Sequence, residues 1–104
     1  NASAAPSLVI FDGFVGYDSV IASKLDEAKS EVDAVLSSKA TSGDLNNTCV
    51  VYALSKNYMD AESACSEAIT KAKKENVSRQ TLRAMKSNLK IVTQQIQDYS
   101  SAAD

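Results

Sequence analysis

The chain has 104 residues with 11 basic and 13 acidic side chains, which is the size and balance of one globular domain. It contains no histidine, the usual residue for proton transfer near neutral pH and the commonest metal ligand, so histidine-based catalysis is excluded. Its two cysteines alone cannot complete a zinc site, and no stretch approaches the roughly 18 apolar residues of a membrane span. We therefore predict a non-enzymatic domain with no cofactor, metal or membrane span.

Residues 1–16 are predicted to form an N-terminal tail. They begin with a run of small residues like that beside a signal-peptidase site, which indicates a mature exported chain, periplasmic or secreted. Asn1-Ala2 is also the pair left by a common tag cleavage, so residues 1 and 2 are a candidate vector scar. The apolar run 8–11 is expected to be a short extended segment packed over a helix end.

Residues 17–104 are predicted to form a single helical domain. Apolar residues recur at spacings of four and three from about Tyr17 to Ser38, which predicts a first helix with the inner positions Ile21, Leu25, Ala28, Val32 and Val35. The single proline and all three glycines precede Asp44, so nothing after it strongly opposes helix.

Three more helices are expected after a break at residues 42–44. Asp44 is expected to cap a helix that ends near Ser55, and a turn at residues 56–57 leads into the next one. Ser78 is expected to cap the last helix, whose apolar stripe is Leu82, Met85, Leu89, Val92, Ile96 and Tyr99. This stripe fits either docking onto the other helices or a coiled-coil contact. The result is an all-α fold of about four antiparallel helices.

Residues 44–69 read DLNNTCVVYALSKNYMDAESACSEAI. Leu45 and Tyr52 fall at the large anchor positions of a first helix, and Ala61 and Ala68 at the small positions of a second. This pattern resembles the tetratricopeptide repeat, a helix–turn–helix unit of about 34 residues. The resemblance implies a repeat-like hairpin over residues 44–73, flanked by an N-terminal helix and a C-terminal capping helix; a plain four-helix bundle is the alternative.

The chain departs from the repeat pattern at both cysteines and lacks the proline that follows the second helix. The resemblance implies binding of a protein or peptide in a concave surface. The positions that contact ligands in that family correspond to Asn46, Asn47 and Val50, which are expected to be exposed.

Cys49 and Cys65 lie at similar distances before and after the turn at residues 56–57, so they should be nearly level on facing helices. That placement predicts a disulfide, worth on the order of 3 kcal/mol for a loop of about 15 residues. A pair of reduced buried cysteines and a redox-active pair are the alternatives.

Charge is uneven along the chain, with 4 basic and 10 acidic residues up to position 70 and 7 basic and 3 acidic residues after it. Arg79, Arg83, Lys86 and Lys90 share one face of the last helix. This face is a candidate site for an anion or an acidic partner, or an ordinary solvated face. Nucleic acid is not expected, because no aromatic or glycine-rich element accompanies the basic residues.

The sequence thus favours a protein–protein interaction module, a scaffold or adaptor, from an exported protein of bacterial type. One alternative is a structural four-helix bundle that acts by self-association, for example as a homodimer. Another is a carrier of a small ligand in a cavity between helices.

Overall fold

The structure, a computed structural model, describes residues 7–103 and contains five helices and no strand in that range. The all-α fold class is confirmed. The candidate vector scar at residues 1 and 2 lies outside the described residues. The helices are α1 (Tyr17–Ile21), α2 (Leu25–Asp33), α3 (Ser42–Leu54), α4 (Tyr58–Glu75) and α5 (Arg79–Ala103).

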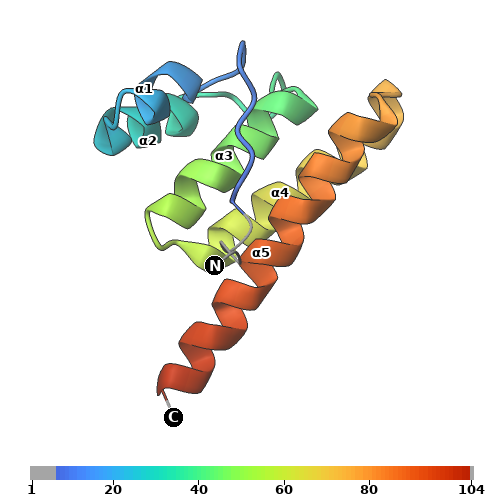
Figure 1. Ribbon diagram of the computed structural model, residues 1–104. Helices are drawn as coiled ribbons and strands as arrows, with labels where there is room; N and C mark the ends of the chain where they lie inside the picture. The colour runs from blue at the N-terminus through green and yellow to red at the C-terminus, as the bar shows by residue number, and fades with distance from the viewer. Residues whose placement is uncertain (1–6, 104) are drawn as a thin grey trace.

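Helices α3 and α4 form a closely packed hairpin, and α5 packs against it as the longest helix (Figure 1). The close approach of α3 and α4 is possible because Ala61, Ala68 and Ala72 of α4 are fully buried and small. Helices α1 and α2 form a smaller pair, and α2 packs on α3. Buried apolar residues therefore gather around α3, which lies between the small pair and the two long helices.

The expected single helix over residues 17–38 is wrong, because the chain breaks between α1 and α2. Ser23 takes a left-handed conformation with φ 60°. The Lys24 amide donates to the Ser19 carbonyl at 2.8 Å, and the Ser23 amide donates to the Val20 carbonyl at 3.0 Å. These bonds form a Schellman motif, the common helix ending that usually carries glycine. Because of the break Ile21 is 62% exposed, although its spacing predicted an inner position.

The second expected helix starts three residues early, at Ser42, because Asp44 is not its N-cap. Thr41 is the N-cap, and Asp44 completes a capping box in which each side chain accepts a hydrogen bond from the other's backbone amide at 3.2 Å. Gly43 lies inside the first turn rather than in a loop. The Phe14 ring covers it so closely that an added Cβ would come within 2.4 Å of a ring carbon.

The remaining helix boundaries agree closely with the sequence. Lys56 and Asn76 end α3 and α4 in left-handed conformations, with the same bonding pattern as Ser23. Ser78 accepts a hydrogen bond from the Thr81 amide at 3.1 Å, as expected of a cap for α5.

The apolar stripe of α5 is covered only along its first part. Met85 and Val92 are fully buried against α3 and α4, whereas Tyr99 is 69% exposed. Figure 1 shows the reason, since the C-terminal end of α5 extends beyond the other helices.

Candidate functional site

The N-terminal segment, residues 8–11, lies across α3 and α5 in an extended conformation and is not a free tail (Figure 1). The expected extended segment is present, but it lies along the helices rather than over a helix end. Three asparagine side chains hold it: Asn46 and Asn47 from α3, and Asn88 from α5. We call these three residues the asparagine site.

Asn88 binds both backbone polar groups of Val9. Its Oδ1 accepts from the Val9 amide at 2.8 Å, and its Nδ2 donates to the Val9 carbonyl at 2.8 Å. The same carbonyl accepts a second bond from Asn46 Nδ2 at 3.0 Å. A side-chain amide carries one acceptor and one donor group, as a peptide group does, so Asn88 pairs with Val9 much as a neighbouring β-strand would.

Asn47 repeats this pairing two residues further on. Its Oδ1 accepts from the Phe11 amide at 2.9 Å, and its Nδ2 donates to the Phe11 carbonyl at 2.9 Å and to the Val15 carbonyl at 3.1 Å. In an extended strand the polar groups of alternate residues point to the same side. The two asparagines therefore bind successive groups on one edge of the segment.

The asparagine site is internally connected and completely buried. All three residues are 0% exposed. Asn88 Nδ2 donates to Asn46 Oδ1 at 2.9 Å, and Asn46 Nδ2 also approaches Asn47 Oδ1 at 3.3 Å. A buried amide without partners costs roughly 1–3 kcal/mol. The extended backbone that lies against the site therefore satisfies amide groups that would be costly to leave unpaired in a buried place.

The expectation that Asn46, Asn47 and Val50 are exposed is wrong. Val50 is 3% exposed, and the chain's own segment covers the two asparagines. Asn88 was missed, although the sequence carries a signal for it. It lies three residues after Met85 and four before Val92, which places a polar residue on the buried stripe of the last helix.

The segment also contributes apolar side chains on either side of these bonds. Leu8 packs on a cluster that contains Cys49, Cys65 and Val92, while Phe11 packs on a second cluster that contains Met85. The segment is thus held by its backbone in the middle and by two apolar side chains, three residues apart.

The predicted juxtaposition of the two cysteines is confirmed. The Sγ atoms of Cys49 and Cys65 lie 1.95 Å apart, at disulfide distance, and both residues are buried. The pair joins α3 to α4 within the cluster on which Leu8 packs. It therefore stabilises the surface on which the segment lies.

A second surface lies at the free end of α5. Lys56, Tyr58, Met59, Ile96, Tyr99 and Ser100 line a hollow of about 650 Å³. Met59 and Tyr99 are 67% and 69% exposed, and the rings of Tyr58 and Tyr99 lie 6.4 Å apart. Large apolar side chains that are exposed close to one another are typical of a surface that contacts another molecule.

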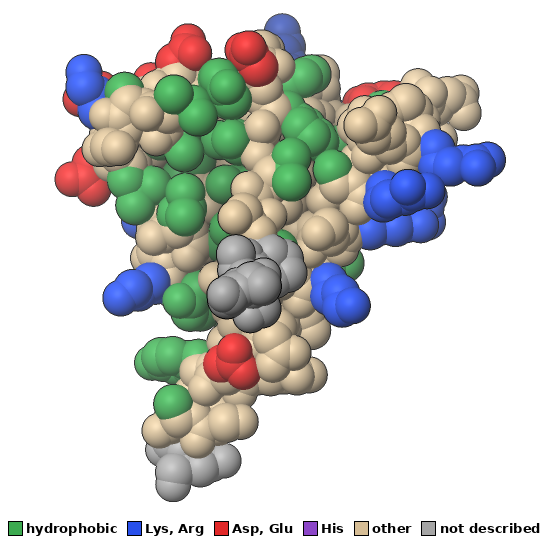
Figure 2. Space-filling view, viewed as in Figure 1, with side chains coloured by type: hydrophobic (Ala, Val, Ile, Leu, Met, Phe, Trp, Pro, Cys, Tyr) green, Lys and Arg blue, Asp and Glu red, His purple; other side chains and the backbone are tan. Residues whose placement is uncertain are grey.

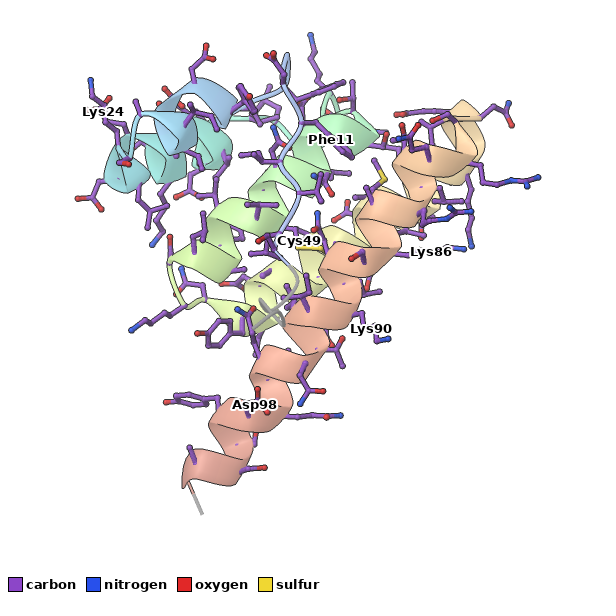
Figure 3. All side chains as sticks on the ribbon, in the orientation of Figure 1. Phe11, Lys24, Cys49, Lys86, Lys90 and Asp98 are labelled. Carbon is purple, nitrogen blue, oxygen red and sulfur yellow. A yellow bond between two sulfur atoms is a disulfide. The ribbon has the colours of Figure 1, made fainter. Side chains whose placement is uncertain are left out.

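The four predicted basic residues do share one exposed face of α5. Arg79, Arg83 and Lys86 line a hollow of about 240 Å³, and Lys90 follows on the same helix. Lys86 and Lys90 point away from the body of the domain in Figure 3, and Figure 2 shows Lys and Arg side chains gathered beside α5.

The Tyr52 side chain has a raised pKa. The Tyr52 hydroxyl of α3 donates to Asp33 Oδ1 at the end of α2, at 2.5 Å. This hydrogen bond, followed by partial burial and by the negative charges of Asp33 and Asp60, raises the pKa of Tyr52 to about 12. The bond links α2 to α3 and lies apart from the asparagine site.

Comparisons with protein-family models, curated proteins and solved structures find no match. Within residues 7–103, no group of three or more His, Cys, Asp or Glu side chains is arranged to hold a metal ion. No described helix has the length and apolar character needed to cross a membrane. The function is therefore argued from the geometry of the asparagine site and its surroundings.

Proposed function

We propose that this domain is a non-enzymatic protein-interaction module that binds an extended peptide segment of a partner along the asparagine site. One observation carries the proposal. Three fully buried asparagines bind the backbone amides and carbonyls of an extended segment, and that segment is separate in sequence from the helices that hold it.

The contacts favour a class of partner rather than one sequence. Hydrogen bonds to backbone groups supply affinity without reading side chains, as in other cases where a strand is added to an edge. Selectivity would come from the positions of Leu8 and Phe11, whose side chains pack on buried clusters. The fitting partner is an extended segment with apolar residues three apart.

The chain's own segment is a competitor for this site. A partner binds only the fraction of molecules whose segment has moved away, so the apparent affinity falls by that fraction. We therefore expect weak binding to the intact chain and stronger binding when its own segment is weakened.

The rest of the chain is consistent with this role. A tetratricopeptide-like unit over residues 44–73 is part of the proposal, supported by the α3–α4 hairpin and its buried alanines. An exported location, periplasmic or secreted, is supported by the cysteine pair at disulfide distance, since disulfides persist in oxidising compartments.

The test weakens the chain's own segment and offers a peptide in its place. Val9→Pro removes the amide that donates to Asn88 Oδ1 and leaves that buried oxygen unsatisfied. A fluorescent peptide with the sequence of residues 7–11 should bind this variant roughly tenfold more tightly than it binds the unchanged chain. Fluorescence anisotropy measures both affinities.

The matched control is the same peptide methylated on the amide nitrogen of the residue equivalent to Val9. It keeps every side chain but cannot donate to Asn88. Equal binding of the two peptides would show that the asparagine site does not hold the ligand, and the proposal would be rejected.

Self-association is the second candidate function, favoured by the apolar surface at the free end of α5. Sedimentation of the chain with and without Tyr99→Ser tests it. A dimer that weakens in the variant would support this role, and a strict monomer in both would contradict it.

A further inference from the structure

We infer that the asparagine site accepts the N-terminal segment of a second copy of this chain, so that two chains exchange residues 8–11 and form a dimer. The inference rests on the proposed function, because it names the partner segment. Every contact between segment and site is already formed within one chain, and the same contacts are available to an identical segment from another.

A hinge connects the segment to the helices. Asp12, Gly13 and Phe14 are all exposed. Gly13 has φ 89°, and in the described part of the chain no heavy atom beyond its two chain neighbours lies within 4 Å of the position where a Cβ would be. Rotation about Gly13 therefore meets no packed neighbour, while the Phe14 ring stays against Gly43.

The chain is fixed again directly after this hinge. The Val15 amide donates to Asp44 Oδ1 at 3.1 Å, and the Val15 carbonyl accepts from Asn47 Nδ2 at 3.1 Å. Opening is thus confined to Asp12 and Gly13, which can span about 7 Å when extended. Exchange therefore requires the second copy to lie directly against this face.

This face also exposes apolar side chains that could contact a second copy. Val9 and Phe14 are 38% and 40% exposed. In Figure 2, apolar side chains gather over the upper part of the molecule around the N-terminal segment. Two chains that exchange segments there would shelter these side chains between them.

The chain's own segment competes with the segment of a second copy, and this competition sets the protein concentration at which exchanged dimers form. A short flexible connection presents its segment at an effective concentration on the order of mM. Dimers of the unchanged chain should therefore appear only at high protein concentration. Variants that favour the exchanged form should bring the transition to lower concentration.

The experiment mixes two full-length variants that each carry one defect of the same contact. Val9→Pro leaves Asn88 Oδ1 without its donor, and Asn88→Ala leaves the Val9 amide without its acceptor. In an exchanged heterodimer the unchanged segment of the Asn88→Ala chain binds the unchanged site of the Val9→Pro chain. The altered segment of the Val9→Pro chain then lies on the altered site of the Asn88→Ala chain. Both unsatisfied groups are then removed, so native mass spectrometry should show at least about tenfold more heterodimer than homodimer of either variant.

The matched control replaces Asn88→Ala with Asn47→Ala. Asn47 binds Phe11 and Val15 but not Val9. Exchange between the Asn47→Ala and Val9→Pro chains therefore leaves as many hydrogen-bonding groups unsatisfied as the homodimers do. Equal heterodimer fractions in the two mixtures would overturn the inference. A dimer held only by the free end of α5 would give this same equal result.

A second variant keeps the inference testable if the Asn88→Ala chain does not fold. Gly13→Ala meets no atom but is strained at φ 89°, and opening the hinge removes that strain. Its dimer association constant should rise at least about tenfold by sedimentation, and no rise would overturn the inference. If the peptide binds the Val9→Pro chain but no exchange occurs, only the inference fails; if the peptide does not bind either, the proposed function fails as well.

Discussion

Replacing Asn88 by alanine is expected to destabilise the domain by about 3 kcal/mol. The variant loses three hydrogen bonds, two to Val9 and one to Asn46. The Val9 carbonyl keeps its bond from Asn46, but the Val9 amide and Asn46 Oδ1 lose their partners. Each buried group left unsatisfied costs about 1–3 kcal/mol, with the lower end for Val9 because that residue is 38% exposed.

A loss of this size is a large share of the 5–15 kcal/mol typical of a small domain, and it corresponds to a fall in Tm of roughly 15 °C. Urea and thermal unfolding followed by far-ultraviolet circular dichroism measure it. Gln97→Ala, an exposed change on the same helix, is the control and should stay within about 0.5 kcal/mol. A loss below about 1 kcal/mol for Asn88→Ala would refute the reasoning.

The near-isosteric change Asn88→Asp adds a pH dependence. The new carboxyl keeps an acceptor for Val9 but, when ionised, faces two further acceptors in a buried place. Burial raises its pKa above the unfolded value of about 3.9. The folded state then binds the proton more tightly, so the variant should be most stable below about pH 4, lose stability as pH rises towards the raised pKa, and change little above it.

Three further predictions concern other parts of the fold. Replacing Cys49 and Cys65 together by alanine should lower stability by about 3 kcal/mol in urea unfolding, and thiol titration of the unfolded parent chain should find no free thiol unless a reductant is present. Asp33→Asn should bring the pKa of Tyr52 from about 12 towards 10, which the ultraviolet absorbance of tyrosinate measures. In the parent chain the pKa of Tyr52 is higher in the folded state than in the unfolded state. The stability that this hydrogen bond contributes is therefore complete below about pH 10 and is lost as the pH rises to about 12. Ser23→Gly should raise stability by roughly 0.5–1 kcal/mol, because glycine adopts φ 60° without strain; an unchanged or lower urea midpoint would contradict this.

The helices after residue 41 could be predicted from sequence because their signals are local. Apolar spacing, a turn at residues 56–57 and a serine cap at Ser78 fix where α4 and α5 begin. The cysteine pair followed from the same hairpin, since two residues at similar distances from a turn lie nearly level on adjacent helices.

The structure of the N-terminal third was harder to predict from sequence because it depends on contacts between residues far apart in the chain. Ser23 ends α1 in a conformation that usually requires glycine, so no residue type signalled the break. Among residues 7–103, residues 8–11 have no hydrogen-bonding partners near them in sequence. Their partners lie 36 to 79 positions away, and no periodicity within the segment can identify them.

Helix α3 shows how the asparagine site could have been found from sequence. Its apolar residues do not keep to one face, and nine of its 13 residues are buried. A helix without a polar face lies in the interior, so Asn46 and Asn47 would both need partners there, as would Asn88 on the buried stripe of α5. Backbone groups within a helix are already bonded to one another, and so the partners had to come from a stretch without helix. Residues 8–15 are the longest largely apolar stretch outside the helices. The need to satisfy buried asparagine side chains therefore accounts for both the extended segment and the asparagine site.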